Sequence, residues 1–207
     1  MIPRQRSGRP DAGVVLAVVG TDVHAFDRLT DWLRRWYTDR FGDPSAAGGA
    51  GGATPELVLQ YGHSRAPDLP GAVPFLGHEA LQRAMAEATL VISHGGPATI
   101  TEARRNGHLP IVVPRDPAHR EHVDNHQQLF ARRLGAAGMV WLCETEAELV
   151  EALDKGLADP SAFALSADAR AQESRAEAVA KVGRIVENLV AQRSRRSVRP
   201  AAGRWRR

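Results

Sequence analysis

The chain has 207 residues, with a formal net charge of +3 and a sequence pI near 9.6. Ten arginines lie in residues 1–10 and 193–207, which contain no acid; without them 17 basic side chains face 24 acidic ones. The folded part therefore carries a net charge of −7. This excludes a basic nucleic-acid-binding face on the body, because such proteins concentrate Lys and Arg where they meet the phosphates.

The composition is otherwise that of one globular domain, with 43% apolar residues to build a core. Cys143 is the sole cysteine, so no intrachain disulfide can form and a reducing compartment is expected. No apolar run is long enough to span a membrane, and residues 1–12 are basic without the apolar stretch of a signal peptide. We expect a cytoplasmic protein. A second expectation is that it is recruited to the inner face of the plasma membrane.

The first half of the chain alternates strand and helix patterns. Residues 14–19 form a short β-branched run that is apolar throughout, which is typical of a buried parallel strand. Apolar side chains then recur at helical spacing, at Phe26, Leu29, Leu33 and Trp36. Residues 42–55 are rich in Gly and Ala and predict a flexible loop. A strand is expected over 56–60.

The middle of the chain continues the alternation. We expect an extended piece around 73–76, a helix over 79–88 and a strand at 90–92. Pro97 begins a helix that runs to about Arg105, because proline at the first helical position gives up an N–H that has no intrahelical partner.

The last third of the chain contains further strand and helix patterns. The sequence predicts these elements in order: a strand at 111–113, a polar loop over 114–123, a helix at 124–134, a strand at 139–142 and a helix at 145–157. Thr145 and Glu148 have the spacing of a capping box. Residues 167–192 read as a long amphipathic helix that either closes the sheet or docks a partner. The arginine tail 193–207 is expected to be disordered, either solvated or in contact with anionic lipid.

This repeated alternation predicts an α/β fold, a Rossmann-like parallel sheet with helices on both faces. Ligands of such sheets bind beyond the carboxyl ends of the strands. The segments expected along that rim are Gly20-Thr21, Tyr61-Gly62-His63, His94-Gly95-Gly96 and Pro114-Arg115.

The segment from Ile92 to Glu102 is the most informative for chemistry. A buried strand ends in two glycines and a helix begins, and the free N–H groups of a helix start suit a phosphate or diphosphate. Thr99 adds a hydroxyl, and Glu102 is placed to accept hydrogen bonds from a ribose diol. Neither a Walker loop nor Gly-x-Gly-x-x-Gly is present, which disfavours a nucleoside triphosphatase or a nicotinamide enzyme. The plainer alternative is a strand–helix turn with glycines for packing.

Three motifs in order resemble the C-terminal domain of glycosyltransferase family 28. They are SHGGPATITEA from Ser93, then Gly107-x-x-Pro-Ile-Val-Val-Pro-Arg115, then Glu121-His-Val-Asp-Asn-His-Gln127 with a later Gly138. The resemblance spans roughly residues 13–155. It is strongest to short, single-domain members such as the catalytic subunits of two-part UDP-GlcNAc transferases and of split bacterial exopolysaccharide transferases.

The resemblance implies the donor-binding half of a GT-B enzyme, with these substrate contacts. Gly95 and Gly96 hold the UDP diphosphate and Glu102 the ribose. The other implied contacts are Gly20 and Thr21 for diphosphate and sugar, Phe75 and Leu76 near the uracil, and Asn125, His126 and Gln127 for the sugar hydroxyls. The chain departs from the family at Pro97-Ala98, from which we expect only a slight narrowing of the site.

The activity implied by the resemblance is inverting transfer of a hexose or N-acetylhexosamine from a UDP-sugar to a lipid-linked acceptor. No metal or other cofactor is implied, because backbone dipoles stabilise the departing diphosphate. A membrane-anchored partner subunit would supply the acceptor and the main base. His94 is the candidate base in this chain, or else a histidine that only supports the loop. The alternative function is a non-catalytic nucleotide-binding or regulatory subunit on the same fold.

Three histidines form a second cluster in the sequence, His119, His122 and His126, with acids between them. They raise a third hypothesis, a metal hydrolase, but Pro117 places the first in a loop and only two can share a helix face. We therefore expect polar loop residues and sugar contacts and no metal. Trp32 and Trp36, at helical spacing, are expected in the core or on a partner surface, and Cys143 as a buried thiol.

Overall fold

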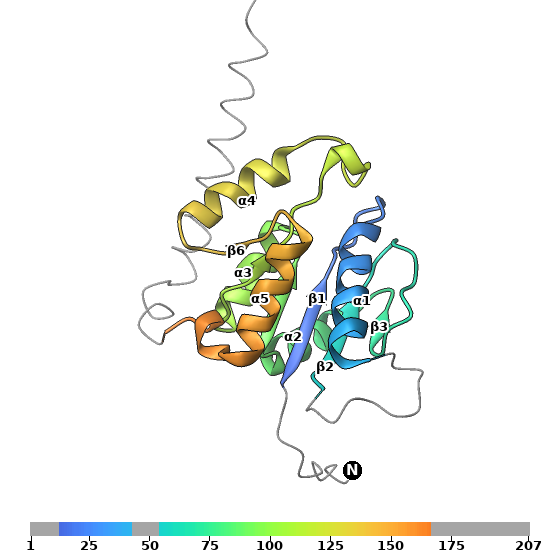
Figure 1. Ribbon diagram of the computed structural model, residues 1–207. Helices are drawn as coiled ribbons and strands as arrows, with labels where there is room; N and C mark the ends of the chain where they lie inside the picture. The colour runs from blue at the N-terminus through green and yellow to red at the C-terminus, as the bar shows by residue number, and fades with distance from the viewer. Residues whose placement is uncertain (1–12, 43–53, 167–207) are drawn as a thin grey trace, which may run out of the picture.

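The computed structural model describes residues 13–42 and 54–166 (Figure 1). The expected loop over 42–55 lies mostly outside the described residues. The expected helix at 167–192 and both basic ends lie outside them altogether. Within the described part of the chain, no helix is long and apolar enough to cross a membrane.

In the described part of the chain six strands form one sheet in the order β3-β2-β1-β4-β5-β6, and every neighbouring pair is parallel. Their bounds are β1 Val14–Val18, β2 Glu56–Gln60, β3 Ala72–Val73, β4 Leu90–Ser93, β5 Ile111–Val112 and β6 Trp141–Leu142. All four residues of β4 are buried, as are all of β1 except its first. The continuous apolar runs therefore mark the centre of the sheet, as a strand covered on both faces requires.

Five α-helices of residues 13–42 and 54–166 cover the two faces of this sheet (Figure 1). Their bounds are α1 Asp27–Phe41, α2 His78–Glu87, α3 Pro97–Arg105, α4 His126–Ala136 and α5 Glu146–Ala158. Helices α1 and α5 share one apolar cluster with β1 through Ala17, whereas α2 and α3 pack against Leu16 and Val18 from the opposite face. Helix α4 packs through Phe130 and its apolar neighbours against Ile100 of α3 and Val112 of β5. The predicted fold class is confirmed.

Several predicted element boundaries are confirmed. Strand β2 has the expected ends, Pro97 is the first residue of α3, and Thr145 and Glu148 close the capping box of α5 with both reciprocal hydrogen bonds. The expected helix at 79–88 begins and ends one residue earlier. The two short 3-10 helices, η1 at Pro117–His119 and η2 at Pro160–Phe163, have no counterpart in the prediction.

Two other boundaries differ for local reasons. Helix α4 begins two residues later than predicted, because the Asp124 carboxylate accepts the backbone N–H of His126 at 3.2 Å and turns the chain just before the helix. The expected strand at 139–142 is reduced to Trp141–Leu142, since the N–H of Met139 closes the end of α4 by bonding to the Leu134 carbonyl.

Of the two placements expected for the tryptophans, core or partner surface, Trp36 takes the core, and Cys143 is buried as predicted. The Trp36 ring is 4% exposed, and its indole N–H lies 3.2 Å from Asp154 Oδ1, so the polar tip is satisfied. Trp32 is partly buried against the same cluster. Burial raises the pKa of the Cys143 thiol to about 12, so this cysteine stays protonated and unreactive at neutral pH.

Candidate functional site

The order of the strands places the topological switch point of the sheet between β1 and β4, where parallel sheets hold their ligand crevice. The chain winds outward from β1 in one direction through β2 and β3, and from β4 in the other through β5 and β6. At such a switch point the connections leave in opposite directions, which opens a ligand site beyond the carboxyl ends of the two strands. Val19 and Gly20 follow β1, and His94 follows β4 directly. The rim segments predicted from the sequence thus meet at this edge.

The His94 ring lies between two glycines at this switch point. A Cβ at Gly20 would lie 2.8 Å from the ring, and a Cβ at Gly96 would lie 2.5 Å from Nε2. Gly20 also has a φ of +90°, which other residues rarely adopt. Both glycines are thus required by the close approach of the imidazole, a reason that the sequence motif alone does not reveal.

The environment of His94 keeps the imidazole neutral. Its Nδ1 lies 3.3 Å from the Val18 carbonyl oxygen, which can only accept, so we assign the hydrogen to Nδ1 and the lone pair to Nε2. Burial lowers the pKa of His94 to about 4, and the positive charge of Arg115 adds to the effect. At neutral pH His94 is therefore a weak base.

The low pKa of His94 predicts an acid-sensitive fold. In the unfolded chain this histidine has a pKa near 6.5, so between pH 6.5 and pH 4 the unfolded state binds a proton and the folded state does not. Its stabilising contribution is therefore complete above pH 6.5 and is lost as the pH falls toward 4. Between pH 7 and pH 5 we expect the free energy of unfolding to fall by about 2 kcal/mol on this account.

Urea unfolding across this range measures the effect, and the free energy of unfolding should fall more steeply with pH in the parent than in His94→Asn. The exposed-site control His78→Asn should keep the parent slope, and equal slopes in parent and His94→Asn would contradict the assignment.

The start of α3 offers backbone N–H groups to the crevice. Among the described residues no side chain caps Gly96, the residue that precedes the helix. The N–H of Gly95 is bonded to Ser93 Oγ at 3.2 Å, and Pro97 has none. The amides left to meet an anion are therefore those of Gly96, Ala98 and Thr99. The role of Gly95 is conformational instead, because its φ is +91° where the buried strand turns into the helix.

Thr99 and Glu102 extend this site along α3. They are three residues apart on one helix, both are partly buried, and three-residue spacing puts side chains on one face. With the described residues Glu102 makes a long, partly exposed ion pair with Arg105, at 3.5 Å. Such a pair contributes little, so the carboxylate remains available to a ligand.

A buried arginine lies behind the crevice. Arg115 is 1% exposed, and its guanidinium donates to three carbonyl oxygens, those of Val19 at 2.9 Å, His24 at 2.7 Å and Glu121 at 3.0 Å. It also lies over the Phe26 ring, 5.0 Å from its centroid. Burial lowers the pKa of Arg115, and the charges of Asp22 and Glu121 oppose this effect. Arg115 thus joins the loop after β1 to the loop after β5.

A second arginine ties the same loop to α1. Arg28 donates from Nε and Nη2 to the two carboxylate oxygens of Glu121, at 2.9 and 2.8 Å, and from Nη2 to the Pro114 carbonyl. Glu121 is 3% exposed, and it also accepts the backbone N–H of Asp116 at 2.8 Å. The bidentate pair is therefore a buried one that fixes the loop geometrically.

The family is decided by the match to a known domain model. The model of the glycosyltransferase family 28 C-terminal domain matches residues 56–182, more than half of the chain. The chain belongs to this family. Among the curated proteins no sequence matches significantly.

Solved structures similar to this family 28 domain are glycosyltransferases. The glycotransferase of kitacinnamycin superposes with a TM-score of 0.56 at 19% identity, covering 93% of this chain and 46% of that one. MurG of Acinetobacter baumannii gives 0.55 at 20% identity, with 88% and 51% covered. The calicheamicin glycosyltransferase CalG4 gives 0.51 at 19% identity, with 96% and 47% covered. The chain thus has the fold of the C-terminal half of a GT-B enzyme and spans about half the length of these structures.

The remaining predicted donor contacts of the family 28 domain lie in the rim loops and at the start of α4. Thr21 is exposed in the loop after β1, and Leu76 is partly buried. Phe75 is 48% exposed, and its ring meets the His63 ring edge-on with 5.3 Å between centroids. His63 in turn lies 2.9 Å from the Asp22 carbonyl oxygen, which brings the loops after β1 and β2 together.

The third motif of the family 28 domain begins α4. Asn125 precedes the helix, His126 is its first residue, and Gln127 follows. Asn125 and His126 are exposed, whereas the Gln127 carboxamide oxygen is buried and has no hydrogen-bond partner among the described residues. Buried polar atoms without a partner are rare, and this oxygen is thus available to accept a hydrogen bond from a ligand.

Sequence reasoning left Arg28, Arg115 and Asp22 without a role. Only Arg115 carried a signal, because a family motif contains it and it follows a buried strand. Nothing in the sequence pairs Arg28 with Glu121, since 93 residues separate them. Asp22 accepts the N–H of His24 at 2.8 Å, and this bond lowers the pKa of its carboxyl, which stays ionised at the crevice.

Proposed function

We propose that this chain is the donor-binding part of a glycosyltransferase that uses a UDP-sugar. In this proposal it transfers a hexose or an N-acetylhexosamine to a lipid-linked acceptor held by a membrane-anchored partner. Membership of family 28 supports sugar transfer. The observation that carries the proposal is the uncapped start of α3 at the β1–β4 switch point, a site suited to a diphosphate.

In the proposed reaction the acceptor hydroxyl oxygen attacks the anomeric carbon of the sugar from the face opposite the diphosphate. The new C–O bond forms as the bond from that carbon to the diphosphate breaks, so the configuration inverts. UDP leaves with the bonding electrons, and the hydroxyl proton passes to a base. The amides of Gly96, Ala98 and Thr99 stabilise the charge that develops on the diphosphate, without a metal ion there.

The base is assigned to the partner in this proposal. His94 is too weak a base at neutral pH to accept the hydroxyl proton efficiently.

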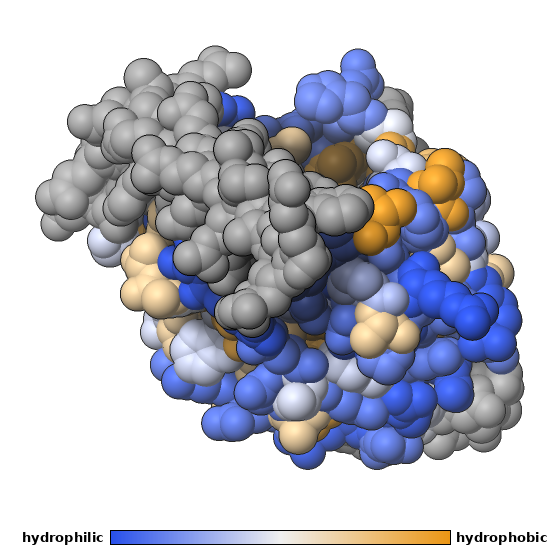
Figure 2. All heavy atoms as spheres, turned by 90° about the horizontal axis from the view of Figure 1, so that it is seen from above, coloured by the Kyte–Doolittle hydropathy of each residue, from blue (hydrophilic) through white to orange (hydrophobic). Residues whose placement is uncertain are grey.

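The rim loops expose hydrophobic side chains. Among the large exposed hydrophobic side chains of the described residues, three lie on rim loops: Val23, Phe75 and Val123. Figure 2 shows hydrophobic spheres on this mostly hydrophilic face. These side chains favour an apolar contact of the rim with the partner or its lipid.

The weak basicity of His94 also favours a second candidate function, a nucleotide-binding subunit without activity of its own. Both functions predict UDP binding, but only the first predicts transfer when a partner is present. Co-expression with a membrane-anchored candidate, followed by transfer assays over a panel of UDP-sugars, separates them. Binding without transfer for every partner and sugar would support the second.

Glu102 tests the donor site directly. We expect Glu102→Ala to weaken UDP binding at least about tenfold, because hydrogen bonds from the ribose hydroxyls to a carboxylate are lost. Titration calorimetry or a UDP-dependent thermal shift measures the change. Glu79→Ala, an exposed glutamate in the first turn of α2, is the matched control and should bind UDP like the parent. If the parent shows no UDP binding at all, the proposed function is wrong.

A further inference from the structure

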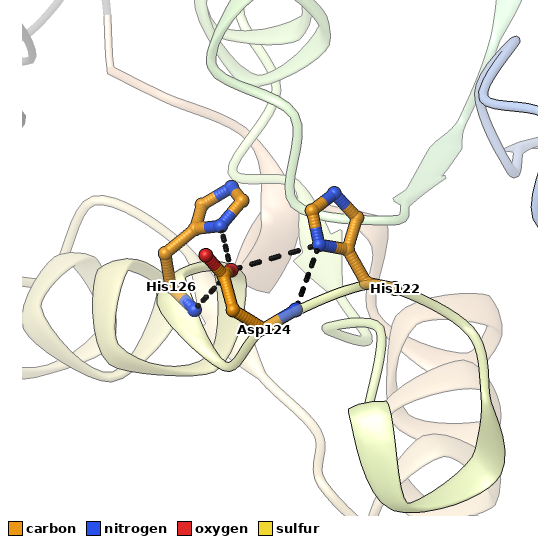
Figure 3. Close-up of side chains that lie close together, drawn as sticks. All are labelled: His122, Asp124 and His126. Atoms are coloured by element: carbon orange, nitrogen blue, oxygen red, sulfur yellow. Dashed lines mark hydrogen bonds and ion pairs between the residues drawn. The ribbon is translucent and has the colours of Figure 1, made fainter.

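Two histidines and an aspartate converge beside the crevice, at the start of α4 (Figure 3). His122, Asp124 and His126 each offer one ligand atom, and these atoms all lie within 4.8 Å of one another. In Figure 3 both imidazoles turn toward the Asp124 carboxylate from opposite sides. The residues between them point elsewhere, since Val123 is 77% exposed and Asn125 is exposed as well.

Each side chain already presents a ligand atom to the centre of the group. His126 Nδ1 is in contact with Asp124 Oδ1, and His122 Nδ1 lies 3.6 Å from the same oxygen. His122 Nδ1 also accepts the backbone N–H of Asp124 at 3.4 Å. This bond assigns the lone pair to Nδ1 and the hydrogen to Nε2. The bond is long, and a metal ion at Nδ1 takes its place, since a neutral imidazole has one lone pair for either partner.

A second carboxylate supports His122 from behind. Asp22 Oδ2 lies 3.9 Å from His122 Nε2, the nitrogen that faces away from the group, which is within ion-pair range but longer than a hydrogen bond. A histidine that ligates a metal commonly turns its other N–H toward a carboxylate, which fixes the ring and its tautomer. His24 adjoins this pair, with its ring centroid 5.9 Å from that of His122. The group is thus backed by the loop after β1.

We propose that His122, Asp124 and His126 form a binding site for a divalent transition-metal ion of the zinc class. Two imidazoles and one carboxylate suit Zn²⁺, Ni²⁺ or Co²⁺, and neither Mg²⁺ nor Ca²⁺, which prefer oxygen ligands. Three protein ligands leave coordination positions open to water or a small anion. The ion joins the rim loop to the first residue of α4, where His126 is also a predicted contact of the sugar hydroxyls.

This site revises the expectation from the sequence, in which the three histidines compete as ligands and no metal is expected. His119 lies in η1 and outside the group, and Asp124 takes its place. The expectation from sequence spacing assumes that the histidines lie on a regular helix. Residues 121–125 instead form bends before α4 begins. The chain therefore brings residues at every second position together, which helical spacing does not anticipate.

The test is metal binding by the full chain without a histidine tag. After removal of metals with a chelator, Zn²⁺ is titrated by calorimetry and Co²⁺ by its visible absorption. We expect one equivalent to bind, with a Co²⁺ spectrum typical of mixed nitrogen and oxygen ligands. His122→Ala, Asp124→Ala and His126→Ala should each weaken Zn²⁺ binding by about a hundredfold. Even the loss of a residue that only hydrogen-bonds to a metal ligand lowers metal affinity by about tenfold to a hundredfold.

His119→Ala is the matched control, because it removes an exposed histidine of the same loop that lies outside the group. It should bind Zn²⁺ like the parent. Circular dichroism of each variant without metal checks that the fold is kept. Equal affinities in parent and His126→Ala, or an equal loss in His119→Ala, would show adventitious binding to scattered surface histidines and overturn the proposal. Neither result depends on UDP or on an acceptor.

Discussion

Replacing Arg115 by methionine should lower the free energy of unfolding by about 3–5 kcal/mol, the cost of removing one partner from a buried charged network. Methionine fills much of the volume of arginine but donates no hydrogen bond. The carbonyl oxygens of Val19, His24 and Glu121 would then be buried without their donor. This loss is a large part of the free energy of unfolding of a typical domain, which is about 5–15 kcal/mol.

Urea unfolding at pH 7 measures this effect. Arg132→Met is the matched control, because Arg132 pairs with Glu144 on the surface and its side chain is 54% exposed. That exposed pair contributes at most about 1 kcal/mol, so the control should unfold close to the parent. Arg115→Lys should lie between the two variants, since an ammonium keeps the charge but cannot bond to three oxygens in the plane of a guanidinium. A loss in Arg115→Met no larger than in Arg132→Met would rule out the joining role of Arg115.

The fold could be predicted from the sequence because its signals are local. Val14–Val18 and Leu90–Ser93 are short, apolar and bounded by turns, which is enough to identify central parallel strands. Thr145 and Glu148 mark a helix start within four residues of each other. Each of these patterns is complete within one segment, so no knowledge of distant contacts is needed.

The site could be predicted only in part, because its geometry depends on contacts between distant segments. The motif around Gly95 and Gly96 indicates a diphosphate site, but it does not show that Ser93 occupies the Gly95 amide. Nor does it show that the His94 ring occupies the space beside Gly96. The Arg115 network likewise joins loops 91 or more residues apart, from Val19 and His24 to the loop after β5. A short-range pattern carries no information on such pairs.

The start of α3 also allows binding and stability to be separated with one substitution. Ala98 is exposed in the first turn of the helix, directly beside the amides assigned to the diphosphate. Ala98→Glu places a negative charge there. The charge interacts favourably with the helix dipole, so the free energy of unfolding should stay equal or rise by up to about 1 kcal/mol. The same charge repels the diphosphate, and like charges brought together cost several kcal/mol, so UDP should bind about a thousandfold more weakly.

Ala98→Gln is the matched control, since it adds the same bulk without the charge. We expect it to weaken UDP binding much less than Ala98→Glu, and the gap between the two variants should narrow as the salt concentration rises. Calorimetry for UDP and urea unfolding, on the same three proteins, give the two quantities. If both variants lose affinity equally, bulk at position 98 is responsible and the diphosphate does not lie at the helix start. If only the glutamate variant loses it while remaining as stable as the parent, the helix start binds the diphosphate through its amides, because a destabilised fold cannot explain the loss.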